Sequence, residues 1–417
     1  MVKTILILGA GFAGLKTAKD LSKKADPRVC KIILVDKNDF HIYTPDLYEI
    51  ASSFRAKISD KCLLELKDSV ATNIYDIIDK NKVEFIRGEV IKIDPKRRMV
   101  LLKGQKIKYD CLVVALGSLN NTYGIPGLDR FSYAVKTVRD AIILNCHIDT
   151  YLRTLWRANA KKNISINIGG GGATGVEFAG ELISYVKFLC EKYKYPTRRV
   201  KVTIIQGSNE LIGLGKKVSD IAVARLNAKG VDVIFDRYIN KVSPAEIELK
   251  SGSGELTVIP SDLLVWTGGV KVNDVVADAL GDKNEGGAVA VDRFLQSKKY
   301  RDVFAVGDNA AVPNKKTGKR VPMLARYAFE EGALLAENLC RKMRGRKLLP
   351  FRVAEEVVII PIAGKFGILK YRNIVISGKI AWYCRRLVDL WYCLKILPVF
   401  KALKKWRKDT GIFVEND

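Results

Sequence analysis

Two glycine-rich segments have the spacing needed to bind a dinucleotide. In the first, Gly9, Gly11 and Gly14 follow an apolar run at 4–8 and precede a helical pattern at 15–22. Gly9 permits a tight turn, Gly11 lets the backbone approach a pyrophosphate, and Gly14 lets helix and strand pack closely. The free N–H groups and the positive dipole end of a helix N-terminus favour phosphate at this point.

The strand that follows completes this fingerprint. Residues 31–35 are apolar and β-branched, and the run ends at Asp36, whose carboxylate can accept hydrogen bonds from the ribose hydroxyls of an adenosine. Three residues next to the glycine loop or to Asp36 belong to the same predicted site: Phe12, Ala13 and Lys37.

The second segment repeats the pattern about 160 residues later. Gly170, Gly172 and Gly175 follow the apolar run at 164–168, and the next strand, 200–205, ends at Gln206. An NAD-specific site usually has a carboxylate at that position, so the choice between NADH and NADPH stays open. The other residues that we expect at this second site are Ala173, Thr174 and Gly268.

Two fingerprints predict one nucleotide that is held permanently and a second that visits. We expect an α/β fold with two Rossmann-like domains and a C-terminal amphipathic region. The first domain is discontinuous (1–120 and 270–340), the second is inserted at 121–269, and the C-terminal region covers 341–417. Strands at 109–115 and 302–306 belong to the first domain. Ligand groups come from the carboxyl ends of such strands, which makes candidates of Ala115, Gly117 and Asp308.

Composition limits the chemistry that the side chains can perform. The chain has 2 histidines, and none of its 8 cysteines forms a CxxC pair. A metal centre and Ser-His-Asp machinery are therefore not expected, and a disulfide reductase is disfavoured. Transfer of a hydride between two bound nucleotides needs no protein nucleophile.

The net charge of +26 is concentrated near the C-terminus. Residues 341–408 contain 18 basic and 3 acidic side chains. Two helical patterns separated by Pro398 combine an apolar stripe, including Trp391 and Trp406, with an opposite basic face. Such helices lie on anionic membranes. Docking on the protein's own core or on a second copy of the chain, and a nucleic-acid groove, are the alternatives; we expect no nucleic-acid partner. No apolar run is long enough to suggest a transmembrane helix.

These segments together resemble the type II NADH dehydrogenases, which are single-chain NADH:quinone oxidoreductases among the two-dinucleotide-binding flavoproteins. The resemblance spans nearly the whole chain, and the segments that carry it are HIYTPDLYEIA (41–51), YGIPG (123–127), GGATGVEFAGE (171–181) and FAVGD (304–308). It implies FAD in the first domain and NAD(P)H in the second. It also implies that Asp308 holds the ribityl chain and that Glu177, the candidate catalytic residue, lies near the flavin–nicotinamide junction.

The helix expected between Pro322 and Leu339 adds a further contact. If its N-terminus points at the flavin, Leu324 and Ala325 supply backbone donors and the dipole stabilises an anionic reduced flavin.

Departures from the family pattern leave the electron acceptor open. Residues 324–331 read LARYAFEE where the family has paired glutamines at its quinone pocket, and 115–117 read ALG instead of ATG. The leading expectation is electron transfer from NADH through FAD to a quinone, by an enzyme bound peripherally to the cytoplasmic face of the cell membrane and capable of forming a homodimer. A soluble NAD(P)H-dependent reductase and an NAD(P)H-responsive binding module remain as alternatives.

Overall fold

The computed structural model describes residues 2–54, 66–160, 162–314, 318–354 and 357–416. The chain forms two compact units. The first comprises 1–42, 71–119 and 270–354, and the second comprises 43–70, 120–269 and 355–417. The segments 43–70 and 355–417 thus group with the inserted domain. Strands β10 (Ser118–Asn120) and β19 (Val270–Val272) stand where the chain passes between the units.

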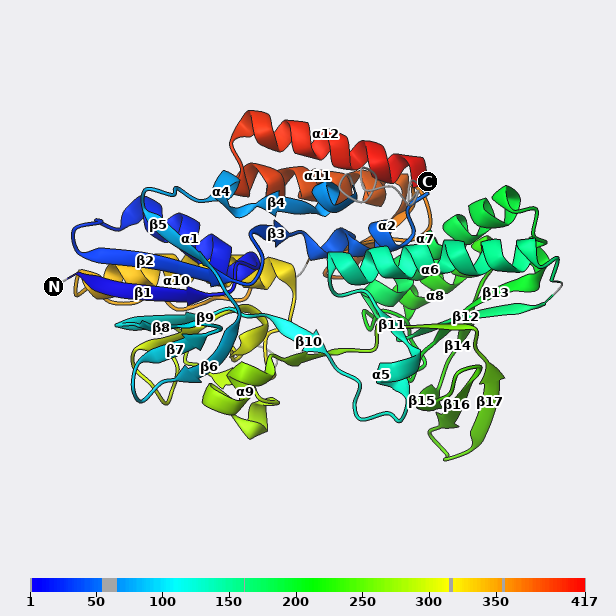
Figure 1. Cartoon of the computed structure of the whole chain (residues 1–417), viewed down its shortest axis with the longest axis horizontal. Coiled ribbons are helices and arrows are strands. Elements are labelled where there is room, and N and C mark those ends of the chain that lie inside the picture. The colour runs from blue at the N-terminus through cyan, green and yellow to red at the C-terminus, as the bar shows by residue number, and fades with distance from the viewer. Residues whose placement is uncertain (1, 55–65, 161, 315–317, 355–356, 417) are drawn as a thin grey trace. The chain divides into compact units, whose positions relative to one another are not determined.

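The first unit is built on a parallel sheet in the order β21-β9-β1-β2-β5 (Figure 1). The bounds of these strands are Val303–Ala305, Cys111–Val114, Lys3–Leu8, Cys30–Asp36 and Val83–Arg87. The three central strands are nearly continuous apolar runs and are buried, as strands covered on both faces must be. An antiparallel sheet, β6-β7-β8 (Val90–Asp94, Met99–Leu102, Gln105–Lys108), completes this part of the chain.

Helices α1 (Phe12–Lys24) and α10 (Ala325–Met343) of this unit pack against each other through small residues. A Cβ on Gly332 would lie 2.4 Å from the Ala13 carbonyl oxygen. The Thr17 hydroxyl lies within hydrogen-bond distance of the carbonyl oxygens of Ala13 (2.9 Å) and Gly332 (3.2 Å). The two backbones therefore approach closely, and the contact fixes α1 relative to α10.

The second unit repeats the architecture. Its parallel sheet has the order β11-β18-β12-β13-β14, with bounds Tyr133–Ala134, Leu263–Trp266, Ile164–Gly169, Val200–Ile205 and Val231–Ile234. In both sheets the strand before the glycine loop is central, and the next strand in the chain pairs beside it. Helices α6 (Val138–Arg157), α7 (Ala173–Lys192) and α8 (Lys216–Lys229) belong to this unit. The prediction of two Rossmann-like folds is confirmed.

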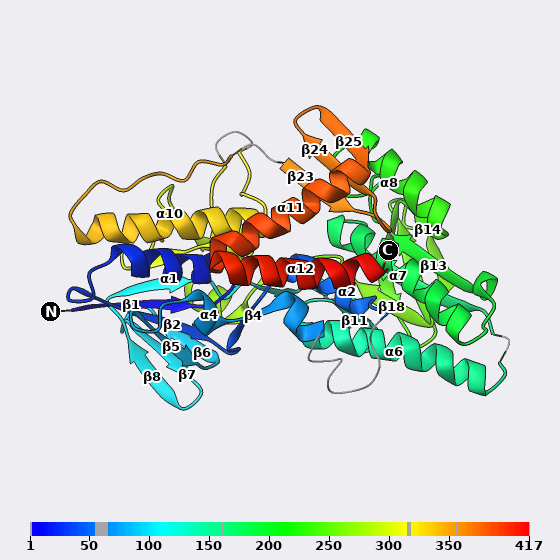
Figure 2. The same cartoon turned by 90° about the horizontal axis from the view of Figure 1, so that it is seen from above.

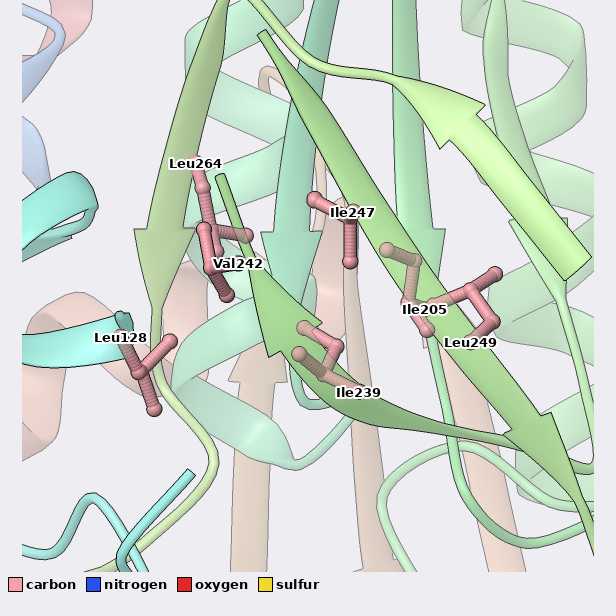
Figure 3. Close-up of a cluster of buried hydrophobic side chains, with 7 residues drawn as sticks. All are labelled: Leu128, Ile205, Ile239, Val242, Ile247, Leu249 and Leu264. Atoms are coloured by element: carbon pink, nitrogen blue, oxygen red, sulfur yellow. The ribbon is translucent and has the colours of Figure 1, made fainter. Parts of the chain in front are cut away.

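An antiparallel sheet, β15-β16-β17, packs on the second unit's parallel sheet. Its strands are Arg237–Val242, Glu246–Ser251 and Leu256–Pro260. Figure 3 shows the buried side chains gathered between this sheet and α5 (Leu128–Phe131), β13 and β18, and they are Leu128, Ile205, Ile239, Val242, Ile247, Leu249 and Leu264. This cluster holds β15 against the carboxyl end of β13.

The C-terminal segment of the second unit contains the antiparallel strands β23 (Val357–Pro361), β24 (Gly367–Tyr371) and β25 (Ile374–Gly378). Two helices follow, α11 (Lys379–Ile396) and α12 (Val399–Asn416), and they lie side by side (Figures 1 and 2). Within the described residues, we find no helix with the length and apolar character needed to span a membrane.

The remaining elements are short. They are β3 (Phe40–Ile42), α2 (Leu47–Ala51), β4 (Ala71–Asn73), α4 (Ile74–Ile77), α5 (Leu128–Phe131), α9 (Asp274–Leu280), β20 (Val289–Ala290) and β22 (Ala310–Ala311). Four single 3₁₀ turns accompany them, at Thr44–Asp46, Thr197–Arg199, Lys283–Glu285 and Gly307–Asn309.

The α1–α10 contact yields a stability prediction. Gly332→Val should lower the free energy of unfolding by about 1–3 kcal/mol, because the new side chain must push α10 away from the Ala13 carbonyl. Urea unfolding followed by circular dichroism measures the change. The matched control is Gly252→Val, where a Cβ meets no atom within 4 Å. Equal stability of the two variants would contradict the close helix contact.

Candidate functional site

The glycine loop of the first unit turns the chain sharply from β1 into α1. Gly9 has φ +98°, and its N–H donates to the Val35 carbonyl at 2.7 Å. A Cβ on Gly14 would lie 1.9 Å from the Gly9 carbonyl oxygen, and a Cβ on Gly9 would lie 2.1 Å from that of Ala115. Both positions therefore exclude a side chain, because strand and helix touch through the backbone.

Gly11 differs from the other two loop glycines because it borders open space. A Cβ placed there would meet no atom within 4 Å. Gly11 is also the N-cap of α1, so the N–H groups of the first helical turn, which have no acceptor within the helix itself, lie beside the same space. A ligand phosphate can occupy the volume that a Cβ would fill, and the residues present thus fit a dinucleotide.

Asp36 connects the end of β2 to this loop. One carboxylate oxygen accepts the Ala10 N–H at 2.7 Å, and the other accepts the Asn38 N–H at 2.8 Å. Burial raises the pKa of Asp36, while these two bonds act in the opposite direction. The side chain of Lys37 is exposed. Asp36 therefore fixes the loop in addition to facing the predicted ribose.

His41, which the sequence analysis did not single out as a site residue, supports the loop from the side. The His41 ring is buried, its Nδ1 lies 2.9 Å from the Ala10 carbonyl oxygen, and it packs edge-on against Phe12 at 5.2 Å between centroids. Ala13 is buried against α10, as described above. Phe12 and Ala13 thus lie at the loop, where they were predicted.

Asp308 and Gly117 meet at the carboxyl ends of β21 and β9. The Ser118 hydroxyl donates to the Asp308 carboxylate. The buried Asn309 amide braces Gly117 from both sides: it accepts the Gly117 N–H at 3.0 Å and donates to the Gly117 carbonyl at 2.8 Å. Gly117 has φ +70°, which favours glycine. Ser118 and Asn309 carried no pattern in the sequence that could have identified them.

Glu331 belongs to the LARYAFEE segment, which aligns with the family's quinone pocket, but its carboxylate lies in the interior of the first unit. It is 2% exposed, and its carboxylate accepts the Gly307 N–H at 2.6 Å. Burial raises the pKa of Glu331 to about 8. Glu331 therefore supports the Asp308 loop inside the first unit. The other two charged residues of the segment, Arg326 and Glu330, pair with each other at 2.9 Å.

At the N-terminus of α10, one of the two predicted backbone donors is not available to a ligand. The Leu324 N–H is already bonded to the Pro322 carbonyl at 2.9 Å, because the chain turns tightly before the helix. Ala325 is the first residue of α10, and its N–H has no acceptor among the described residues. Of the two predicted donors, Leu324 is therefore excluded and Ala325 keeps an available N–H.

The second unit repeats the loop geometry closely. Gly170 has φ +110°, and its N–H donates to the Ile205 carbonyl at 2.9 Å. A Cβ on Gly175 would again lie 1.9 Å from a glycine carbonyl, that of Gly170, and a Cβ on Gly172 would meet nothing within 4 Å. Ala173 and Thr174 form the exposed first turn of α7. This loop too leaves room for a pyrophosphate.

A pocket of about 500 Å³ lies beside this second loop, lined in part by Gly170, Gln206 and Gly268. Gly268 packs against Gly170, whose Cβ position is 2.8 Å from the Gly268 Cα. The Thr267 hydroxyl, which the sequence analysis missed, lies 2.9 Å from the Gly170 carbonyl oxygen. Gln206 repeats the role of Asp36, since its amide oxygen accepts the Gly171 N–H at 2.8 Å.

Glu177 lies on α7, one turn beyond the second loop. Burial raises its pKa to about 8; Arg385 lowers the pKa, and Asp46 and Asp389 raise it. The Tyr48 side chain is buried nearby, and its hydroxyl has no hydrogen-bond partner among the described residues. Burial therefore favours the protonated form of Glu177.

The groups around Glu177 form a buried charge cluster, which consists of Asp46, Glu49, Arg385, Arg386 and Asp389. Arg385 pairs with Asp46 at 2.8 Å and also with Asp389. Arg386 lies 3.5 Å from both Glu49 and Asp389. These side chains are all less than 10% exposed. Counting Glu177, the cluster holds four carboxyl groups and two guanidinium groups, so charge balance also favours a proton on Glu177.

The two open glycines yield a paired prediction. Gly11→Val should reduce affinity for the first nucleotide by more than about tenfold, because the side chain fills the phosphate space. Gly172→Val should do the same for the second nucleotide and leave the first bound. Absorbance of the purified protein and titration with the visiting nucleotide measure the two effects. If both variants bind both nucleotides normally, the loops do not hold pyrophosphate.

Comparison with known proteins agrees with this geometry. The type II NADH:quinone oxidoreductase of Staphylococcus saprophyticus is 27% identical over 406 residues, which cover 97% of this chain and 98% of that protein. The relative from Staphylococcus aureus strain MW2 matches equally well, at 27% identity over the same coverage. The resemblance drawn from the motifs is thus confirmed.

Solved structures share the fold. NDH2 from Plasmodium falciparum in complex with NADH superposes with a TM-score of 0.86 at 17% identity, covering 100% of this chain and 98% of that one. The sulfide:quinone oxidoreductase of Aquifex aeolicus gives a TM-score of 0.77 at 21% identity, covering 96% and 94%. The family model for pyridine nucleotide-disulphide oxidoreductases matches residues 3–332. The chain therefore belongs to the pyridine nucleotide-disulphide oxidoreductase family.

Proposed function

We propose that this protein is an FAD-dependent NADH:quinone oxidoreductase that works at a membrane surface. The observation that carries the proposal is the pair of equivalent nucleotide cradles in one chain, each open only at its middle glycine, Gly11 or Gly172. Relatives that align over 97% of the chain are named for this reaction. Stopped-flow reduction of the bound flavin by NADH, followed by reoxidation with a panel of quinones, tests the proposal directly.

In this proposal the first unit holds FAD. The α1 N-terminus and Gly11 receive the pyrophosphate, Asp36 receives the adenosine ribose, and Asp308, oriented by Ser118, receives the ribityl chain. Lys37, Ala115 and Gly117 flank these contacts. FAD supplies the acceptor for hydride from NADH and the donor of electrons to the quinone. The open Ala325 N–H at the positive end of α10 would favour negative charge on a cofactor bound there.

The second unit holds NADH in the pocket beside Gly170 and Gly268. The first turn of α7, with Ala173 and Thr174, faces the pyrophosphate in the same way as the first turn of α1 does. The loop contacts of Thr267 and Gln206 keep Gly170 and Gly171 in place. This unit binds and releases its nucleotide in every turnover.

Proton balance gives Glu177 a role. NADH, one proton and a quinone yield NAD⁺ and a quinol, so one proton must be supplied for each turnover. Glu177 carries a proton below pH about 8, and the arginines of the buried charge cluster stabilise the carboxylate left when it is given up. We assign Glu177 as the acid that holds this proton.

The corresponding prediction is that Glu177→Gln lowers the rate of quinone reduction by about a hundredfold. The rate in the wild type should fall as the pH rises through about 8, because the protonated form is present below that pH and lost above it. The variant should lack this fall. Steady-state rates measured from pH 6 to 10 give both results.

The matched control is Glu191→Gln, on an exposed position of the same helix. It should keep the rate and the pH profile of the wild type. A Glu177→Gln enzyme that retains the wild-type alkaline fall would exclude Glu177 as the titrating acid.

The C-terminal helices provide the membrane contact. Helix α11 buries Arg385, Arg386 and Asp389 in the charge cluster, and a set of its large apolar residues is exposed on the other face. With the start of α12 they form an exposed apolar face, made of Ile380, Tyr383, Leu387, Val388, Trp391, Leu394, Val399, Phe400 and Leu403. Phe400 is 89% exposed. Water disfavours such a face, and a bilayer interface covers it.

Basic residues accompany this apolar face. Lys401, Lys404, Arg407 and Lys408 of α12 are exposed. Each adds about 1 kcal/mol of attraction to anionic lipid at low salt. One member of the predicted stripe does not belong to the face: Trp406 is half-buried and donates to the Arg386 carbonyl at 2.9 Å. We place the protein peripherally on the cytoplasmic, anionic leaflet.

The membrane prediction uses Leu387→Glu with Trp391→Glu. The double variant should lose binding to liposomes with anionic lipid, because two charges replace the centre of the apolar face. Lys401→Gln with Lys404→Gln should weaken binding mainly at low salt. Sedimentation with liposomes measures both, and Leu256→Glu on β17 is the control.

Two outcomes would contradict this placement. Cosedimentation of the Leu387/Trp391 variant at the wild-type level would locate the contact elsewhere. A wild-type dimer that this variant converts to monomers would assign the face to a second copy of the chain. Point changes are preferable to truncation, because removing α11 would leave Asp46 and Glu49 buried without their arginines.

A further inference from the structure

Where β13 ends, the wall of the second unit's nucleotide pocket carries a positive charge. Besides Gly170 and Gly268, its wall includes Gln206, Gly207, Ser208 and Arg237. Arg237 is the one charged residue in the wall, and no carboxylate is present there. In the first unit the equivalent position at the end of β2 is Asp36, a carboxylate. The second pocket therefore favours an additional negative charge on its ligand, and the first does not.

The Gln206 side chain is occupied by contacts within the protein. Its amide oxygen accepts the Gly171 N–H, and its Nε2 donates to the Ser208 hydroxyl at 2.7 Å and to the Glu210 carbonyl at 3.0 Å. Our expectation that Gln206 itself would meet the ribose is therefore incomplete. Gln206 performs the loop-holding task of Asp36 without a charge, and recognition falls to its neighbours.

Arg237 has N–H donors that its contacts within the protein do not use. It is the first residue of β15, and its guanidinium donates to the Asp236 carbonyl at 3.2 Å and to Glu255 at 3.3 Å. Glu255 is 64% exposed, so this ion pair is a weak surface contact. A guanidinium has five N–H donors, and a phosphate that accepts two of them competes well with such a partner.

Backbone donors lie beside Arg237. Among the described residues, the N–H groups of Gly207 and Ser208 donate to no protein acceptor. The Tyr238 ring covers Gly207 so closely that a Cβ there would lie 2.3 Å from a ring carbon. Tyr238 is 59% exposed, and its ring offers a face for a base to stack on. The site thus combines a cation, open amides and an aromatic surface.

The position of Arg237 is fixed by the core beneath it. Ile239 and Val242 of β15 pack into the buried cluster of Figure 3 together with Ile205, the residue before Gln206. The start of β15 and the end of β13 are therefore held together, and the Arg237 N–H donates to the Gln206 carbonyl at 3.2 Å. Arg237 is thus placed beside the Gln206 turn without any ligand present.

We propose that this pocket also takes NADPH, with the 2′-phosphate bound by the Arg237 guanidinium and the N–H groups of Gly207 and Ser208. The inference rests on the proposed function, in which the second unit holds the nicotinamide coenzyme, and adds a second coenzyme to it. NADPH, one proton and a quinone then give NADP⁺ and a quinol, with the hydride passing to the flavin as it does from NADH. An acid at the end of β13 would repel the phosphate, and Gln206 does not.

Nucleotide fragments test the subsite without any redox chemistry. Adenosine 2′,5′-bisphosphate should bind the FAD-loaded enzyme at least about tenfold more tightly than 5′-AMP does, by isothermal titration calorimetry. Arg237→Gln should remove most of this difference. Lys241→Gln, on the same strand but outside the pocket, should retain it. Equal affinity of the wild type for the two fragments would overturn the proposal.

Coenzyme turnover gives the second measurement. Arg237→Gln should lower the ratio of kcat/KM for NADPH to that for NADH by about tenfold, and Gln206→Glu should lower it as well, since a glutamate can still accept the Gly171 N–H. An unchanged ratio in Arg237→Gln would overturn the subsite while NADH oxidation stands. If neither coenzyme reduces the flavin and neither fragment binds, the proposed function fails, and this inference fails with it.

Discussion

Each unit depends on a strand and a helix meeting so closely that a backbone carbonyl occupies the place of a side chain. A Cβ on Gly14 or on Gly175 would lie 1.9 Å from the carbonyl oxygen of the first loop glycine in its own unit. This contact fixes the direction in which the helix leaves the sheet. The amino terminus of that helix is consequently aimed at the space in front of Gly11 or Gly172, and the nucleotide sites follow from it.

The two units differ in what stabilises this shared turn. In the first, the Asp36 carboxylate accepts the loop N–H, His41 lies against the next carbonyl, and Glu331 and Asn309 hold the neighbouring strand ends. In the second, the neutral Gln206 amide accepts the Gly171 N–H and the Thr267 hydroxyl contacts the Gly170 carbonyl. The larger number of contacts around the first loop suits a cofactor that stays bound. The pocket of the second unit, with its neutral amide, suits a coenzyme that is exchanged. The same backbone geometry is thus compatible with two different roles.

The C-terminal helices follow a different constraint. Helix α11 buries Arg385, Arg386 and Asp389 beside Trp382, Tyr392 and Ile396. It exposes a second set of large apolar residues on its other face, which a helix docked on a soluble core would not do. A buried ion-pair cluster adds little net stability, but removal of one partner is costly, so the cluster specifies how α11 is seated. It also surrounds Glu177 with charges. Docking of the helix and exposure of the apolar face therefore have one origin, while burial is the main cause of the raised pKa of Glu177.

The sequence by itself determined the local features of this protein. Glycine spacing, apolar runs and residues at strand ends predicted both nucleotide-binding folds, because these patterns act through neighbouring backbone atoms. The strand 200–205 was predicted with its observed bounds, and the two C-terminal helices were expected on either side of Pro398.

Only the tertiary structure decided which groups meet from distant parts of the chain. Helical periodicity tells which residues of α11 share a face, but not which face is covered, and the answer came from Asp46 and Glu49, more than 300 residues earlier. The burial of Glu331 under Gly307, the inward orientation of Gln206 and the approach of Arg237 to the pocket are likewise long-range contacts. Such contacts depend on how sheets and helices pack, and packing leaves no periodic signal in the sequence, because the residues that meet are set by the path of the whole chain.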